Sequence, residues 1–188
     1  MEEFKVNKEI RECIKIRLIF FSVIGYAIGA GLVSYIGRVI NPQIFWLGLI
    51  IVILFCLCTD TLSCFFNLNE FTNKKSTPKF PLLRNSFLIL SLSLLTIGAI
   101  LSVLLYSITE LNFVLWVFLG LFFIILVLSV IPPFFLNKKG YGGFFNTISA
   151  VALAPSFACI LQINELHRIL LLITFPAFFL LALQYLLP

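Results

Sequence analysis

The chain has 188 residues, of which 61% are hydrophobic and 11% are charged, and its formal net charge is +5. Soluble globular domains carry about 25% charged residues, so this composition excludes an ordinary soluble domain and favours an integral membrane protein. No nucleic acid is expected as a partner, because basic loops beside apolar segments already account for the net charge.

Apolar runs of about 20 residues, bounded by charges or by Pro, Asn and Gly, predict membrane-spanning helices. Six such runs lie at 18–36, 45–66, 87–107, 113–135, 144–162 and 169–187. These runs are continuously apolar, unlike the alternating segments of about ten residues in a β-barrel, and a helix satisfies all its backbone groups within one segment. The prediction is an all-α fold in a single transmembrane domain, 1–188, with six transmembrane helices.

The segment 1–17 spaces Phe4, Ile10 and Ile14 among charged residues, which favours a short helix in the membrane interface over a frayed terminus. The run 18–36 that follows is too long for the core of a signal peptide and is expected to be a mature helix. Its glycines, Gly25, Gly29 and Gly31, predict close approach of a second helix, which is a packing role rather than a chemical one.

Asp60, the only aspartate of the chain, lies near the end of the run 45–66. Helical spacing from Asp60 gives a narrow polar stripe, which consists of Cys56, Ser63, Cys64 and Asn67. A carboxylate inside a span costs ~2.5–3.5 kcal/mol on insertion scales, so this stripe is expected to face the bundle interior or a wet cavity. Asp60 is therefore the candidate catalytic residue, and it joins Ser63, Cys64 and Asn67 as candidate ligand-binding residues. The alternative is a structural carboxylic acid that donates a hydrogen bond to a neighbouring helix.

Two loops are candidates for function. The segment 67–86 is predicted as a loop of about 20 residues, and loops of that length are often lids. The segment 137–143 holds Lys138, Lys139 and Tyr141 among glycines, which suits a phosphate or diphosphate. The alternative for the second loop is an ordinary basic segment followed by a turn.

Basic residues near the ends of spans are retained on the cytoplasmic side of a membrane. Eleven of the 13 Lys and Arg residues fall in the segment 1–17 and in the loops after the second and fourth runs. Both termini are therefore predicted to be cytoplasmic, in a bacterial inner membrane or its equivalent. The lipid bilayer is the first expected partner, with anionic headgroups beside the basic loops.

Metal and soluble-enzyme signatures do not occur in the sequence. The five cysteines lack the spacing of a zinc site or a disulfide framework, and His167 is the one histidine. There is no P-loop, no G-x-S-x-G and no H-E-x-x-H. No metal site is predicted from these residues. If a metal binds, Asp60 and Glu70 are the candidate ligands.

The order of these features resembles the UbiA-type prenyltransferase superfamily, intramembrane enzymes that join isoprenyl diphosphates to aromatic or porphyrin-like acceptors. The resemblance starts with Arg17 and with Asn41-Pro42 ahead of LGLIIVILF, and continues through the basic glycine loop 137–143. Two helices with internal prolines, Pro155 and Pro176, complete it. It covers nearly all of the chain and implies the first six helices of the family's bundle.

Members of that family hold Mg²⁺ against the substrate diphosphate with two aspartate-rich motifs. The first, N-D-x-x-D, would fall on residues 63–67, where Cys64 and Asn67 stand in place of the aspartates. The second would follow the sixth helix, where the chain reaches Pro188. The resemblance therefore implies a shortened, non-catalytic relative, a pseudoenzyme, whose cavity holds an isoprenoid, a quinone, a pigment tail or a lipid. Mg²⁺ is expected only if the protein is an enzyme.

Three functions remain open at this point. The leading hypothesis is an accessory or structural subunit that packs with other membrane-protein subunits in a larger complex. The second is an active Mg²⁺-dependent prenyltransferase that another chain completes. The third is a small transporter or channel that uses Asp60 as a proton or cation site, although the two halves of the sequence show no convincing repeat.

Overall fold

The computed structural model describes residues 16–72, 79–109, 113–128, 130, 142–165 and 167–186. Its elements are α2 (Ile16–Tyr35), α3 (Pro42–Thr72), α4 (Lys79–Thr109), α5 (Phe113–Leu128), α6 (Gly142–Thr147), the π-helical turn η1 (Ile148–Leu153), α7 (Ala154–Ile163) and α8 (Arg168–Leu186). Because α6, η1 and α7 are continuous, these elements form six helical rods. No strand occurs among the described residues, so the predicted all-α fold is confirmed for them.

Four of the rods are long and apolar enough to cross a membrane: Leu18–Tyr35, Pro42–Phe66, Arg84–Ile108 and Phe144–Ile163. The apolar stretches of α5 and α8, Leu115–Ile125 and Arg168–Leu180, are shorter. Within the predicted run 113–135, α5 ends at Leu128 and Val130 lies in a turn, while 131–135 lies outside the described residues.

The predicted long loop 67–86 was wrong. The helix α3 continues to Thr72 and α4 begins at Lys79, so 73–78 alone lies outside the described residues. Polar residues from Asn67 onward end the apolar run without ending the helix, since a loss of hydropathy does not by itself stop a helix. Pro81 fits in the first turn of α4, where a backbone N–H would lack a helical partner in any case.

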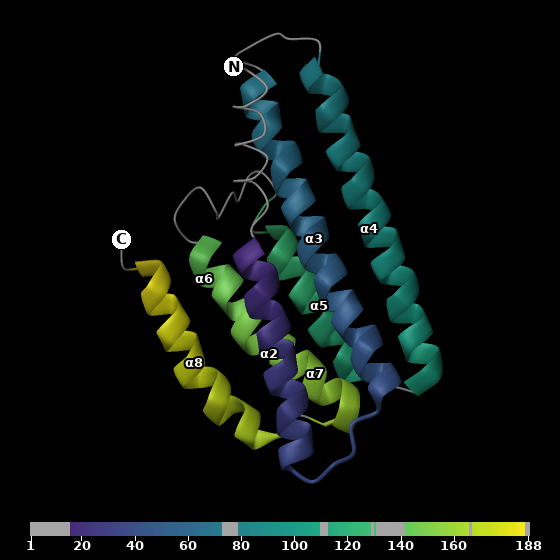
Figure 1. Ribbon diagram of the computed structural model, residues 1–188, viewed down its shortest axis with the longest axis vertical. Helices are drawn as coiled ribbons and strands as arrows, with labels where there is room; N and C mark the ends of the chain where they lie inside the picture. Colours follow the sequence, from purple (N-terminus) through teal and green to yellow (C-terminus); the bar gives the residue numbers. More distant parts are fainter. Residues whose placement is uncertain are drawn as a thin grey trace.

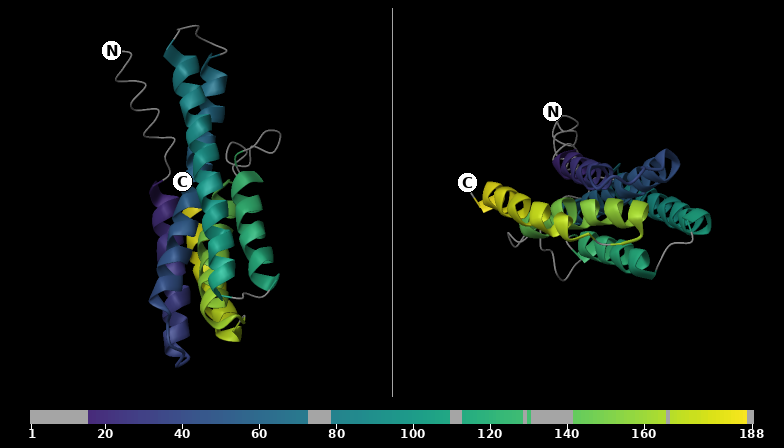
Figure 2. Two further views of the ribbon diagram at one scale, coloured as in Figure 1. Left: turned by 90° about the vertical axis from the view of Figure 1, so that its right-hand side faces the viewer. Right: turned by 90° about the horizontal axis from the view of Figure 1, so that it is seen from below.

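The helices α3 and α4 form a long antiparallel hairpin that projects past the other helices at one end (Figures 1 and 2). Each has 31 residues. At ~1.5 Å per residue such a helix is about 46 Å long, longer than a hydrocarbon core of about 30 Å. The start of α2 and the end of α8 lie at the same end of the bundle (Figure 1). Which side of a membrane that end faces stays a prediction.

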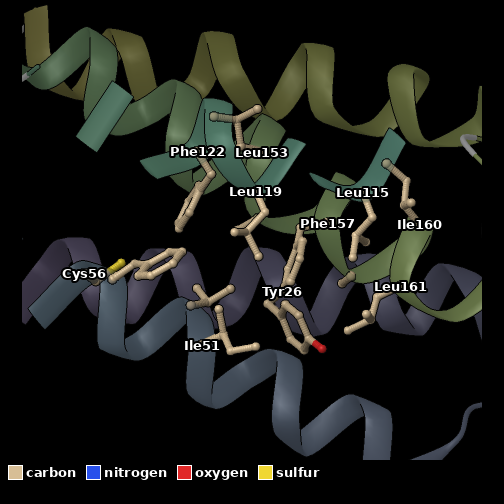
Figure 3. Close-up of a cluster of buried hydrophobic side chains, with 14 of the residues drawn as sticks. Tyr26, Ile51, Cys56, Leu115, Leu119, Phe122, Leu153, Phe157, Ile160 and Leu161 are labelled. Atoms are coloured by element: carbon tan, nitrogen blue, oxygen red, sulfur yellow. The ribbon is translucent and has the colours of Figure 1, made fainter. Parts of the chain in front are cut away.

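Apolar side chains from α2, α3, α5, η1 and α7 point toward one another and fill the centre of the bundle (Figure 3). Tyr26 is fully buried there, and its hydroxyl donates to the Phe45 carbonyl oxygen at 2.9 Å. The ring of Phe157 packs beside Tyr26, with centroids 6.3 Å apart. The interior at this level is therefore a packed core.

Two of the three glycines of α2 bring this helix against the η1–α7 rod. A Cβ atom on Gly25 would lie 2.1 Å from the carbonyl oxygen of Ala150, and one on Gly29 would lie 2.3 Å from that of Pro155. The predicted close helix contact is confirmed for these two glycines. It was wrong for Gly31, since no described neighbouring atom lies within 4 Å of its would-be Cβ.

At the end of the bundle away from the projecting hairpin end, Gln162 of α7 bonds to the α2–α3 connection. Its Oε1 accepts the Asn41 backbone N–H at 3.0 Å, and its Nε2 donates to the Asn41 carbonyl oxygen at 3.4 Å. The Asn41 side chain accepts the N–H of Gln43 at 3.0 Å and so caps α3 ahead of Pro42. One amide thereby links the α2–α3 connection to the end of α7.

We expect Gln162→Leu to lower the free energy of unfolding by ~1–2 kcal/mol, because it removes two hydrogen bonds from a partly exposed site. Denaturant titration of the purified protein in micelles measures this change. Gln43→Leu is the control, since Gln43 contributes its backbone N–H to the cap. Equal losses in the two variants would contradict the role assigned to Gln162.

Candidate functional site

Asp60 lies inside the bundle, on the half of α3 that is nearer the projecting end of the α3–α4 hairpin. Its side chain is 3% exposed, and Cys56 and Cys64, one helical turn before and after it, are both fully buried. Ser63 of the same predicted stripe is half-buried. The stripe thus faces the interior at Cys56, Asp60 and Cys64, as expected for a carboxylate in an apolar helix.

A thiol of this stripe joins α3 to α2. The Cys56 Sγ donates to the hydroxyl oxygen of Ser22, with the two atoms 3.6 Å apart. Ser22 is 1% exposed, so both groups of this pair are removed from the surface. A weak S–H donor paired with a hydroxyl satisfies two buried polar groups without adding a charge.

A second thiol, on the side of α3 that faces α4, joins these two helices. The Cys58 Sγ lies 3.4 Å from the carbonyl oxygen of Ser91 and 3.5 Å from its Oγ. The Ser91 hydroxyl in turn donates to the Cys58 carbonyl oxygen at 3.4 Å. These contacts place polar groups of three helices, α2, α3 and α4, at about one level of the bundle.

The threonines beside Asp60 bond to their own helix. The Thr59 hydroxyl donates to the Cys56 carbonyl oxygen at 2.8 Å, and the Thr61 hydroxyl donates to those of Leu57 and Cys58, each at 2.9 Å. Such bonds satisfy the hydroxyl groups locally. The polar zone around Asp60 is therefore composed mainly of hydroxyls and thiols that bond to protein atoms.

The donor set differs from that of a magnesium–diphosphate clamp, which needs several hard oxygen ligands. In the part of the chain that the structure describes, no three His, Cys, Asp or Glu residues lie together where they could hold a metal ion. Four cysteines, Cys56, Cys58, Cys64 and Cys159, are buried. The described residues of this zone thus offer Asp60 as their acidic ligand.

Several predicted site residues fall outside what the structure describes. These are the side chains of Asn67 and Glu70, and the residues Lys138, Lys139 and Tyr141. Their roles remain predictions. His167 is described: its Nδ1 accepts the backbone N–H of Ile169 at 3.3 Å, so it caps the start of α8.

Sequence reasoning missed two features of the described residues. Arg84 is half-buried, and its guanidinium carbon lies 5.8 Å from the centre of the Phe65 ring, a cation–π contact between α4 and α3. Asn146, Thr147 and Ser149 are buried polar residues of α6 and η1. The polar pattern N-T-x-S inside an apolar run was the available signal for the second feature.

The fold and this zone together define a class: a helical bundle with membrane-length apolar helices and a buried polar zone around one carboxylate. Comparisons of the chain with protein-family models, curated proteins and solved structures found no match. The UbiA-type resemblance therefore stays a prediction.

Proposed function

We propose that this chain is an integral membrane protein that serves as an accessory or structural subunit of a larger membrane complex, with the outer face of α4 as its contact to other subunits. In this proposal the protein has six transmembrane helices, cytoplasmic termini and a UbiA-like arrangement without that family's catalysis. The α4 face carries the proposal.

The helix α4 lies at one edge of the bundle and packs mainly along α3 (Figure 1). Only 22% of its apolar span is buried, against 78% for Phe144–Ile163. Its exposed side chains include Ile89, Ile97, Ile100, Val103 and Leu104. A helix with so little burial has a wide apolar face for another helix or for lipid.

The filled centre of the bundle also supports a packing role. Ile51 and Phe55 of α3 meet the α5 and α7 side chains there, and both are at most 5% exposed. A prenyl or quinone tail between α3 and α7 would have to displace these side chains. Any isoprenoid or lipid tail is therefore proposed to bind on the outer surface of the helices.

The chemistry of the polar zone fits the same proposal. Catalysis by diphosphate departure depends on preorganised positive charge, which acidic ligands hold in place as Mg²⁺. Hydroxyls and thiols that already bond to protein atoms, as at Ser22–Cys56 and Cys58–Ser91, serve poorly as such ligands. In this proposal Asp60 contributes to the packing of the bundle.

Site-specific photocrosslinking tests the proposal in native membranes. A photoreactive residue at Ile100 of α4 should yield a discrete adduct with a second polypeptide. Phe20 of α2 is the matched control, because both side chains are 61% exposed. The Phe20 position should give no discrete protein adduct.

Asp60→Asn separates this function from its alternatives. An accessory subunit keeps its expression level and its Ile100 adduct in the variant. An enzyme would turn over a prenyl diphosphate with Mg²⁺ and lose that turnover, and a transporter would lose a proton or cation flux in liposomes. A monodisperse chain without partner adducts, or an activity that Asp60→Asn abolishes, would overturn the proposal.

A further inference from the structure

The rod 142–163 contains a π-helical turn in its middle. The element η1 spans Ile148–Leu153, with α6 before it and α7 after it. The backbone N–H of Ala154 donates to the carbonyl oxygen of Ser149, five residues back. A π turn holds one residue more than an α-helical turn, and such turns are frequent at functional positions.

Pro155 gives this turn its physical cause. In an α-helix the proline ring clashes with the carbonyl of the residue four positions back, here Val151. The wider π turn removes that constraint. The next bond in the same register would run from residue 155 to the Ala150 carbonyl, and proline has no N–H to form it.

Gly25 of α2 lies against the carbonyl group that Pro155 releases. A Cβ on Gly25 would be 2.1 Å from the Ala150 oxygen and 3.3 Å from the Pro155 Cδ. The bare Cα of glycine thus approaches this oxygen as a weak C–H donor does at close helix contacts. Proline and glycine act together here: one frees the carbonyl and the other covers it.

We infer that the π turn is a register device, that is, an element that fixes the rotation of α6 relative to α7. Pro155 and Gly25 hold its extra residue in place and thereby determine which side chains of α6 lie inside the bundle. The inference is independent of the proposed subunit function. In the observed register Asn146 and Thr147 are 5% and 2% exposed. The polar amide of Asn146 is therefore kept in the interior.

Relaxation of η1 to an α-helix would rotate α6 by about 100° against α7, one residue step of the helix. Each α6 residue would then take the position of the residue before it. Asn146 would move to the half-buried position of Phe145, and Ile148 would take the interior position of Thr147. The two registers thus exchange an amide for an apolar side chain in the interior.

A cysteine reporter at position 146 tests the device in the full-length protein. Asn146→Cys is placed in a background whose five native cysteines are alanine. Its labelling rate with N-ethylmaleimide is measured in micelles. Pro155→Ala should raise this rate about tenfold, because the reporter leaves the interior. Deletion of Ala152 together with Pro155→Ala should restore slow labelling, since an α-helix one residue shorter returns α6 to its native face.

Pro176→Ala is the matched control, because Pro176 lies inside α8, an α-helix. It should leave the labelling rate at position 146 unchanged. An unchanged rate in Pro155→Ala, or an equal rise in Pro176→Ala, would overturn the inference. If Pro155→Ala gives no folded protein, the added deletion must recover it, and failure of both variants would count equally against the device.

Discussion

Gly29→Ala is expected to cost about 3 kcal/mol or more of folding free energy, the upper end for overpacking a well-packed contact. The new methyl group would lie 2.3, 2.6 and 2.8 Å from the carbonyl oxygen, Cα and carbonyl carbon of Pro155. All three are backbone atoms, so no rotamer change can relieve the clash. The helix α2 would have to separate from the η1–α7 rod.

Gly31→Ala is the matched control, with the same substitution two residues along the same helix. No described neighbouring atom lies within 4 Å of the would-be Cβ of Gly31, so its replacement should stabilise the helix by up to ~1 kcal/mol through propensity alone. Thermal unfolding and the monodisperse fraction in size-exclusion chromatography measure both variants. A Gly29→Ala protein that unfolds at the wild-type temperature would show that α2 and α7 do not meet through this glycine.

The spacing of these glycines could be predicted, but the helix they meet could not. A GxxxG pattern indicates that a backbone approaches closely and carries no information on which backbone does so. The partner is the backbone around Pro155, a residue 126 positions further along the chain than Gly29, where the Ala150 carbonyl oxygen faces Gly25 and the Pro155 carbonyl oxygen faces Gly29. That pairing depends on the register between two helices, which one sequence does not specify.

For the candidate site, the burial of Asp60 could be predicted, but the residues around it could not. Asp60 had to lie inside, because an isolated carboxylate in an apolar run is costly at a lipid-facing position. Its surroundings, the Ser22 hydroxyl on α2 and the Ser91 hydroxyl on α4, come from helices that sequence spacing cannot align. The loop expected at 67–86 failed for another reason: polarity there marks the end of the apolar span, and the helices continue beyond it.

The second large effect is expected at Phe55, where three helices meet. Its side chain is 5% exposed and its ring centroid lies 6.4 Å from that of Phe122 and 5.3 Å from that of Phe123, both on α5. On the opposite side a Cβ on Gly98 of α4 would be 2.8 Å from the Phe55 Cε1. One ring thus holds α4 and α5 against α3.

Phe55→Ala should lower the free energy of unfolding by ~3–5 kcal/mol, the cost of removing a buried aromatic ring and leaving a cavity. The loss is measured by denaturant titration in micelles. Phe20→Ala, on the exposed face of α2, removes the same ring where it is 61% exposed and should cost far less. Equal losses at the two positions would mean that Phe55 is not a packing centre.

A double-mutant cycle shows whether the ring acts through Gly98. Gly98→Ala alone should destabilise the protein by ~1–3 kcal/mol, because its methyl group meets a ring already fixed by Phe122 and Phe123. In a Phe55→Leu background the shorter side chain leaves room for that methyl, so the same substitution should cost at least ~1 kcal/mol less. Additive losses would separate the two residues. Apolar surface alone gives a helix no preference for protein over lipid, so a specific contact is needed to hold α4 to the bundle. Coupling between Phe55 and Gly98 would establish that contact for α4, the helix whose outer face is proposed to meet other subunits.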